Sequence, residues 1–157
     1  CEDRGCQAGV ERARDRGEAA PAHQLLVYPM IHDRNVTPSS RAVTDPELWN
    51  RHNNVIAWQA YLGELYGSDR VPAYAAPTRA TELAGLAPAT ILTAELDLFV
   101  DENIEYAQRL MHSGVPTELH IYPGANHGFD RLNPTARVSR RMLADRDDAL
   151  SRAFARA

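Results

Sequence analysis

The chain has 157 residues, of which 44% are hydrophobic and 24% are charged, and it carries a net charge of −4. This composition is typical of an ordinary globular protein, and the length is enough for one domain. The acidic balance argues against nucleic acid and against an anionic membrane surface as partners.

Neither a membrane anchor nor a disulfide framework is indicated by the sequence. No apolar run is long enough to cross a bilayer, and no signal peptide opens the chain, which favours a cytoplasmic protein. The 2 cysteines, Cys1 and Cys6, are too few for a disulfide framework, and no metal-ligand spacing surrounds them. The chain starts with Cys1 and not with Met, which fits a fragment, a processed product or a trimmed chain.

Residues 5–9, Gly-Cys-Gln-Ala-Gly, match the Gly-x-x-x-Gly pattern of a nucleophile elbow only superficially. The central position holds Gln7, whose amide cannot attack a carbonyl, and Cys6 lies one place too early. An elbow also follows a strand, and residues 1–4 are not typical of one. We therefore interpret the match as a coincidence, because short motifs often occur by chance.

The next stretch predicts a helix end and then a strand. Residues 10–16 are rich in Arg and are followed by Gly17, as at the end of a helix. Residues 24–30, Gln-Leu-Leu-Val-Tyr-Pro-Met, are apolar on both sides, which indicates a buried parallel strand that Pro29 closes.

Residues 31–76 predict a mainly helical insertion. Residues 31–44 are polar and indicate a loop, and Asp45-Pro46 is typical of a helix cap and first turn. Residues 71–77 indicate a loop made stiff by two prolines. Between them, apolar residues recur at helical spacing, and both tryptophans are interpreted as core residues: Trp49, Val55, Ile56, Trp58, Leu62 and Leu65.

A second strand is predicted over residues 90–95, and Asp97 follows it by two positions. Asp101 is interpreted as a cap for a helix over about residues 102–112. The apolar face of that helix contains Ile104, Ala107, Leu110 and Met111.

The third predicted strand, residues 117–122, runs into Tyr-Pro-Gly-Ala-Asn-His-Gly-Phe-Asp at 122–130. A strand that ends in Pro and Gly and then places His127 on a loop can hold a catalytic base. Asn133-Pro134 opens the last predicted helix, which continues to Phe154.

An acid after one strand and a His after the next is the second half of the Ser…Asp…His order of hydrolases. The strand–helix–strand order predicts parallel neighbours whose carboxyl ends share one edge. We therefore expect the Asp97 carboxylate within roughly 2.6–3.2 Å of His127 Nδ1. Asp97 is preferred over Asp101, which has a capping role. The predicted fold class is α/β, with about three parallel strands and covering helices.

These motifs resemble the hormone-sensitive-lipase-like esterases of the α/β-hydrolase fold, most specifically at residues 95–102 and 122–130. The resemblance implies the C-terminal half of such a carboxylesterase, with Asp97 and His127 as the acid and base of a Ser-His-Asp triad. It also implies no cofactor and a short or medium acyl ester as substrate. Within the partial domain 1–157, residues 1–30 and 77–157 would form the core and 31–76 a cap. Through that cap, the candidates for lining a substrate pocket are Trp49, Trp58 and Tyr61.

The nucleophilic serine and the oxyanion-hole glycines of that family have no counterpart in this sequence. There is no Gly-x-Ser-x-Gly and no His-Gly-Gly-Gly, so we expect the isolated chain to be inactive. Three hypotheses remain open. The chain is an esterase that lacks its N-terminal half, a non-catalytic binding module that pairs with another copy or chain, or a half-enzyme that a complementing N-terminal half completes.

Overall fold

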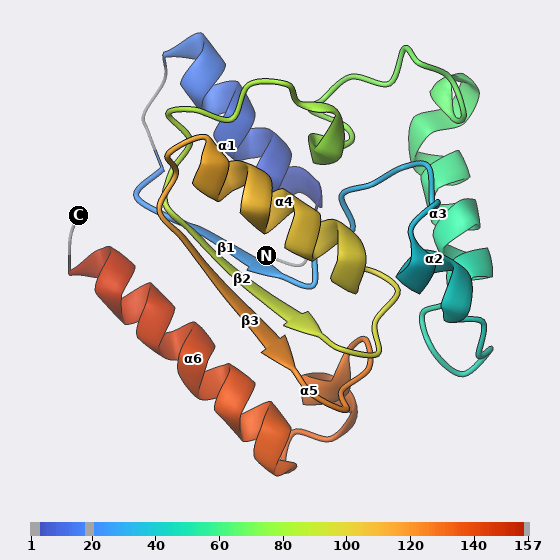
Figure 1. Ribbon diagram of the computed structural model, residues 1–157, viewed down its shortest axis with the longest axis vertical. Coiled ribbons are helices and arrows are strands. Elements are labelled where there is room, and N and C mark those ends of the chain that lie inside the picture. The colour runs from blue at the N-terminus through green and yellow to red at the C-terminus, as the bar shows by residue number, and fades with distance from the viewer. Residues whose placement is uncertain (1–3, 18–20, 156–157) are drawn as a thin grey trace.

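The structure, a computed structural model, describes residues 4–17 and 21–155, and for residues 4–8 it describes the backbone alone. It contains a three-stranded parallel sheet in the order β1-β2-β3 (Figure 1). The strands are β1 (Gln24–Val27), β2 (Ala89–Ala94) and β3 (Thr117–Tyr122). Every residue of the central strand β2 is buried, as expected where helices cover both faces of a parallel sheet. The predicted strands, their order and their direction are confirmed.

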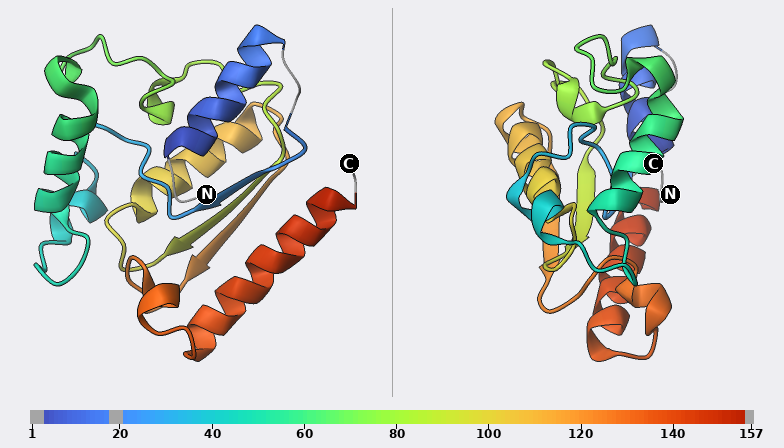
Figure 2. Two further views of the ribbon diagram at one scale, coloured as in Figure 1. Left: turned by 180° about the vertical axis from the view of Figure 1, so that it is seen from behind. Right: turned by 90° about the vertical axis from the view of Figure 1, so that its right-hand side faces the viewer.

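Helices lie on both faces of the sheet (Figures 1 and 2). On one face α1 (Arg4–Arg16) and α4 (Val100–His112) share an apolar core with β1 and β2, to which Val10, Ile91 and Leu110 belong. On the other face α6 (Arg137–Phe154) packs on the sheet through Met142. None of the described helices combines the length and the apolarity needed to span a bilayer.

Several element boundaries differ from those that the sequence predicts. Residues 5–9 lie inside α1, so this stretch does not form a strand-to-helix elbow. The last helix does not open at Asn133-Pro134, because α5 (Phe129–Leu132) comes first and α6 begins at Arg137.

In the segment 31–76, capping side chains decide where the helices begin. The loop predicted over 31–44 contains α2 (Pro38–Ala42), because the Thr37 side chain accepts a hydrogen bond from the Ser40 N–H. The next helix, α3 (Arg51–Leu62), begins at Asn50 as its cap, and not at Asp45-Pro46. It continues into the 3-10 turn η1 (Gly63–Leu65), and a second such turn, η2 (Pro77–Arg79), follows the segment.

The core face of α3 is narrower than its apolar pattern suggests. Trp58 is fully buried, which confirms it as a core residue, and Leu62 is buried beside it. Ile56 was expected on the same face but is 49% exposed, and the polar Asn54 is buried instead. Asn54 is accommodated because its amide donates to the Asn35 side chain at 3.1 Å.

The start of the segment 31–76 is joined to η2, the 3-10 turn that directly follows the end of the segment. The Ile31 carbonyl accepts hydrogen bonds from the backbone N–H and the hydroxyl of Thr78, at 3.3 and 3.1 Å. Arg79 makes a bidentate ion pair with the buried Asp33 carboxylate, at 2.8 and 2.7 Å. The hydrogen bond to Asp33 raises the pKa of Arg79 above its usual value. A charge-assisted, two-pronged contact of this kind fixes geometry as well as position, so α2 and α3 lie in a defined place beside the start of α4 (Figure 1).

The outer edge of β1 leads to a prediction about association. Gln24 and Tyr28 direct their backbone N–H groups to the strand side occupied by β2, so Leu25 and Val27 direct theirs away from it. An open edge beside apolar side chains favours pairing with another chain. We expect the isolated chain to self-associate at micromolar concentration, and Val27→Lys to shift it toward the monomer in sedimentation velocity.

The matched control is Val36→Lys, which places the same charge on a side chain that is 47% exposed in the segment 31–76. It should leave the sedimentation profile unchanged. A wild-type chain that is monomeric and unfolds cooperatively would contradict the prediction.

Candidate active site

Asp97 lies in a tight turn between β2 and α4. Its backbone N–H donates to the Ala94 carbonyl at 3.3 Å, and its own carbonyl accepts from the Val100 N–H at 3.2 Å. The side chain is fully buried. Its Oδ1 atom accepts the Phe99 N–H at 3.1 Å. The turn therefore directs Oδ2 toward the neighbouring loop and satisfies the other carboxylate oxygen.

His127 lies on the loop after β3, and that loop is attached to the loop after β2. The Leu96 N–H donates to the Ala125 carbonyl at 2.8 Å, and the Gly124 N–H donates to the Glu95 carboxylate at 2.8 Å. Gly124 has φ 70°, a conformation that glycine adopts at no steric cost. This lets the chain fold back over the end of the sheet and present the imidazole to Asp97.

The two side chains form the hydrogen bond that the sequence predicts. His127 Nδ1 lies 2.8 Å from Asp97 Oδ2. An ionised carboxylate can only accept, so Nδ1 carries the proton and the lone pair of the neutral ring lies on Nε2. The ring is 25% exposed, so Nε2 belongs to a group that is positioned by the protein but not sealed inside it. This arrangement gives the His127 imidazole a defined tautomer.

Asp101, the competing acid, has a different partner. Its Oδ2 atom accepts the Ser39 N–H at 2.7 Å and so joins α4 to α2. Asp101 is not the N-cap residue of α4, because α4 begins at Val100 after Phe99 as the cap residue, but Asp101 does lie with Glu102 in the first turn of the helix. Met111, expected on the apolar face of this helix, is 47% exposed.

Aromatic side chains surround the His127 ring. The ring centroids of Tyr28 and Phe99 lie 4.7 and 5.3 Å from that of His127, both in edge-to-face geometry. Trp49, from the segment 31–76, lies at 6.2 Å. Trp49 was among the sequence candidates for a substrate pocket, whereas Tyr28 and Phe99 were not singled out. Nothing in their local sequence separates them from ordinary core residues, because only the fold brings them to His127.

Glu102 is a further buried acid near the site that sequence reasoning missed. Its Oε1 atom accepts the N–H groups of Ile31 and His32 at 2.7 and 3.1 Å. Its Oε2 atom is buried and has no hydrogen-bond partner among the described residues. Burial raises the pKa of Glu102 well above its usual value, and the nearby charges of Asp97 and Asp101 raise it further, against the two backbone hydrogen bonds.

Most serine hydroxyls in the described part of the chain donate hydrogen bonds to groups other than His127. Those of Ser39, Ser40 and Ser139 donate to backbone carbonyls at 2.9, 2.9 and 3.2 Å. In residues 21–155 no hydrogen bond joins a serine hydroxyl to His127. Among the described residues, no group of three His, Cys, Asp or Glu side chains is arranged to hold a metal ion.

Comparison with known proteins decides the family. A family model that is described as "alpha/beta hydrolase fold" matches residues 7–131 of the chain. The chain belongs to the α/β-hydrolase family. Esterase LipI of Mycobacterium tuberculosis is 34% identical over 120 residues, which are 76% of this chain and 37% of that protein. Ethyl acetate hydrolase of Pseudomonas putida is 29% identical over the same shares of both chains.

Solved structures of α/β-hydrolases agree with this assignment. A bacterial heroin esterase is 44% identical, with a TM-score of 0.90, over 94% of this chain and 47% of that chain. Esterase LipW from Mycobacterium marinum is 36% identical, with a TM-score of 0.86, over 94% of this chain and 46% of that chain. The resemblance to the hormone-sensitive-lipase-like carboxylesterases is confirmed. The chain spans less than half the length of each of these relatives.

The buried Glu102 carboxyl predicts a pH dependence of stability. Because its pKa is raised in the folded state, folding favours the protonated form. That contribution is fully present below the unfolded pKa of about 4.3 and is lost as the pH rises through the folded pKa. Gln cannot ionise, so we expect the free energy of unfolding of Glu102→Gln to rise relative to wild type as the pH increases from about 5 to 8. Urea denaturation at several pH values measures the difference.

Glu105→Gln, at an exposed position of the same helix, removes one carboxylate without removing a buried one. Its stability should follow the wild-type pH profile. A Glu102→Gln profile that runs parallel to wild type would show that this carboxyl ionises as easily in the folded chain as in the unfolded one.

Proposed function

We propose that this chain supplies the general base and its orienting acid to a serine-dependent carboxylic ester hydrolase, with His127 as base and Asp97 as acid. The observation that carries the proposal is the 2.8 Å hydrogen bond from the imidazole to a fully buried carboxylate. Membership of a family whose relatives are named esterases and carboxylesterases supports it. A buried carboxylate beside Nδ1 holds the ring in the tautomer that a base needs.

The chemistry follows from the free lone pair on Nε2. A serine hydroxyl attacks the ester carbonyl carbon while Nε2 takes its proton, and Asp97 stabilises the imidazolium that forms. When the tetrahedral intermediate collapses, the bond to the alcohol breaks and Nε2 returns the proton to the leaving oxygen. A water molecule then attacks the acyl carbon while Nε2 takes its proton, and Nε2 returns that proton to the serine oxygen as the acyl–serine bond breaks and the acid leaves. No step calls for a cofactor.

The surroundings of His127 support a small, weakly polar ester as substrate. Phe99 and Trp49 place apolar ring surface next to the base. One relative is named for the hydrolysis of ethyl acetate, a small ester. Because Trp49 comes from the segment 31–76, and the start of that segment is joined to η2 by Asp33 and Arg79, we infer that the segment acts as a cap that completes the pocket wall.

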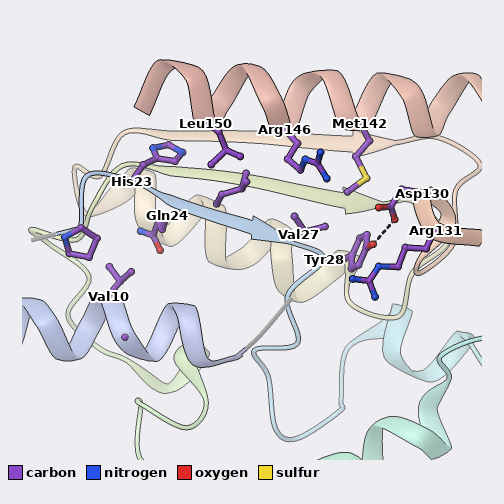
Figure 3. Close-up of a pocket in the computed structure, with 13 residues that line it drawn as sticks. Val10, His23, Gln24, Val27, Tyr28, Asp130, Arg131, Met142, Arg146 and Leu150 are labelled. Atoms are coloured by element: carbon purple, nitrogen blue, oxygen red, sulfur yellow. Dashed lines mark hydrogen bonds between the residues drawn. The ribbon is translucent and has the colours of Figure 1, made fainter. Parts of the chain in front are cut away.

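The serine has to come from polypeptide outside the described residues, and a groove beside β1 favours one place for it. This groove, of about 780 Å³, runs along the outer edge of β1 between α1 and α6 (Figure 3). Val10 lines one wall, and Met142 and Leu150 line the other. It ends at Tyr28 and Asp130, next to His127. A strand added to β1 there, from a longer chain or from a complementing N-terminal half, would reach the base.

A chimaera tests the proposal. In it, this chain replaces the matching region of the bacterial heroin esterase, so that the rest of the relative surrounds His127. We expect hydrolysis of p-nitrophenyl acetate, and a loss of about 10⁴-fold in kcat in both His127→Ala and Asp97→Asn, because either change removes the base or its tautomer. The matched control His112→Ala, at the exposed end of α4, should retain full activity.

If the chimaera is folded and active, and His127→Ala does not lower its activity, then His127 is not the general base. The alternative of a non-catalytic binding module would then be favoured. A chimaera that is sensitive to Asp101→Asn and not to Asp97→Asn would instead reassign the acid.

The isolated chain should behave differently. Without an oriented nucleophile and oxyanion donors, the Asp97–His127 pair can only assist water. We expect the turnover of p-nitrophenyl acetate by the isolated chain to equal that of its His127→Ala variant. Turnover above that level would contradict the prediction, and its loss in Cys6→Ala would identify the thiol as a nucleophile.

A further inference from the structure

We propose that Tyr28 is a positioning residue for His127, which holds the imidazole ring in the orientation that keeps Nδ1 on Asp97. The proposal rests on the proposed role of His127 as the base. Tyr28 is not a catalytic residue in this view, because it acts through the orientation of another side chain.

The backbone of Tyr28 is the first observation. It directly follows β1, and its N–H donates to the Leu92 carbonyl of β2 at 2.6 Å. Its φ angle is +32°, in a region that a bulky side chain rarely adopts. Strained backbone of this kind persists where the surroundings hold it, often at functional sites. The turn takes the chain out of the sheet and leaves the ring against the loop that carries His127.

The side chain of Tyr28 contacts both the loop that carries His127 and α5, which follows that loop. Its hydroxyl donates to Asp130 Oδ1 at 2.5 Å, as Figure 3 shows. Asp130 lies three residues after His127 but 102 positions away from Tyr28. The ring itself meets His127 edge to face at 4.7 Å and is 61° from its plane. The Tyr28 side chain thus connects the end of β1 to α5 and also contacts the His127 ring in the loop before α5.

The segment after Tyr28 is held by the first turn of α4. The Asn103 amide donates to the Pro29 carbonyl at 3.2 Å, and Glu102 accepts from Ile31 and His32. The same turn of helix directly follows the Asp97 loop. The start of α4 therefore fixes both partners of the His127 ring. One is the Asp97 carboxylate at Nδ1, and the other is the Tyr28 ring in edge-to-face contact with the imidazole.

The consequence concerns rotation of the imidazole about its Cβ–Cγ bond. With the Asp97 carboxylate, Tyr28 and Phe99 in place, the ring has contacts that define its plane. Loss of the tyrosine ring would remove one of them and let the imidazole turn away from Asp97. The fraction of molecules with a protonated Nδ1 on the carboxylate would then fall, and catalysis would weaken through kcat, since the change does not remove a substrate contact.

The test uses ¹⁵N-histidine labelling of the full chain and of the chimaera, with NMR detection of the His127 tautomer and its downfield Nδ1 proton. Tyr28→Leu removes the ring, and we expect the downfield proton to broaden or vanish and kcat to fall by about 10- to 100-fold with KM unchanged. Tyr28→Phe keeps the ring and removes the hydroxyl, and we expect a milder loss of about 2- to 10-fold.

Changes at Asp130 separate positioning from general destabilisation. Asp130→Ala should match Tyr28→Phe, and the double variant should be no worse than either, because both break the same hydrogen bond. Asp130→Asn keeps an acceptor oxygen and should restore the wild-type proton signal. Tyr61→Leu and Tyr61→Phe, at a tyrosine that packs against Trp58 and is 50% exposed, should leave the His127 signals unchanged.

The readouts also separate this proposal from the proposed function. A folded Tyr28→Leu chain with an unchanged downfield proton and tautomer overturns the positioning role, whatever the activity. If Tyr28→Leu alters those signals while His127→Ala leaves the chimaera fully active, then Tyr28 positions the ring and the base assignment fails. If Tyr28→Leu does not fold, the comparison of Tyr28→Phe with Asp130→Ala and Asp130→Asn decides.

Discussion

The parallel pairing of β2 with β3 is the interaction on which the candidate site depends. Its register sets Ala94 level with Tyr122, so the two loops leave the sheet side by side. Two hydrogen bonds then join the loops, one from the Leu96 N–H to the Ala125 carbonyl and one from the Gly124 N–H to the Glu95 carboxylate. Asp97 and His127 meet because these contacts fix the distance between the two loops. A hydrogen bond of one imidazole could not by itself hold two mobile loops together against their conformational entropy.

The first turn of α4 gathers the remaining parts of the site. Three consecutive polar residues there hold two segments: Asp101 holds Ser39 of α2, whereas Glu102 and Asn103 hold the stretch from Pro29 to His32. Burial of these groups costs free energy, which the backbone hydrogen bonds they accept and donate offset only in part. Glu102 shows the cost directly in its raised pKa. Such an arrangement is expected where position matters more than stability.

The open edge of β1 is the place where the longer relatives could have additional polypeptide next to this part of the fold. A three-stranded sheet with a groove along one edge is a small core, and the chain covers 47% of the bacterial heroin esterase. The groove and the His127 pair adjoin at Tyr28, which touches both. Whatever polypeptide lies along β1 is therefore adjacent to His127. The fold alone does not decide the reaction, because one architecture serves many activities.

Local pattern determined much of this protein. Apolar or alternating runs separated by helical segments predicted all three strands and their order, and the positions of Asp97 and His127 after consecutive parallel strands predicted their hydrogen bond. These features follow from short-range rules of burial and turn geometry. Tertiary structure alone decided that Asp101 accepts the Ser39 N–H and that Glu102 is buried. It also decided the exposure of Ile56 and the contact of Tyr28 with His127 and Asp130. The physical reason is the same in each case: these side chains take their roles from partners that are tens of residues away in sequence, and only packing brings such partners together.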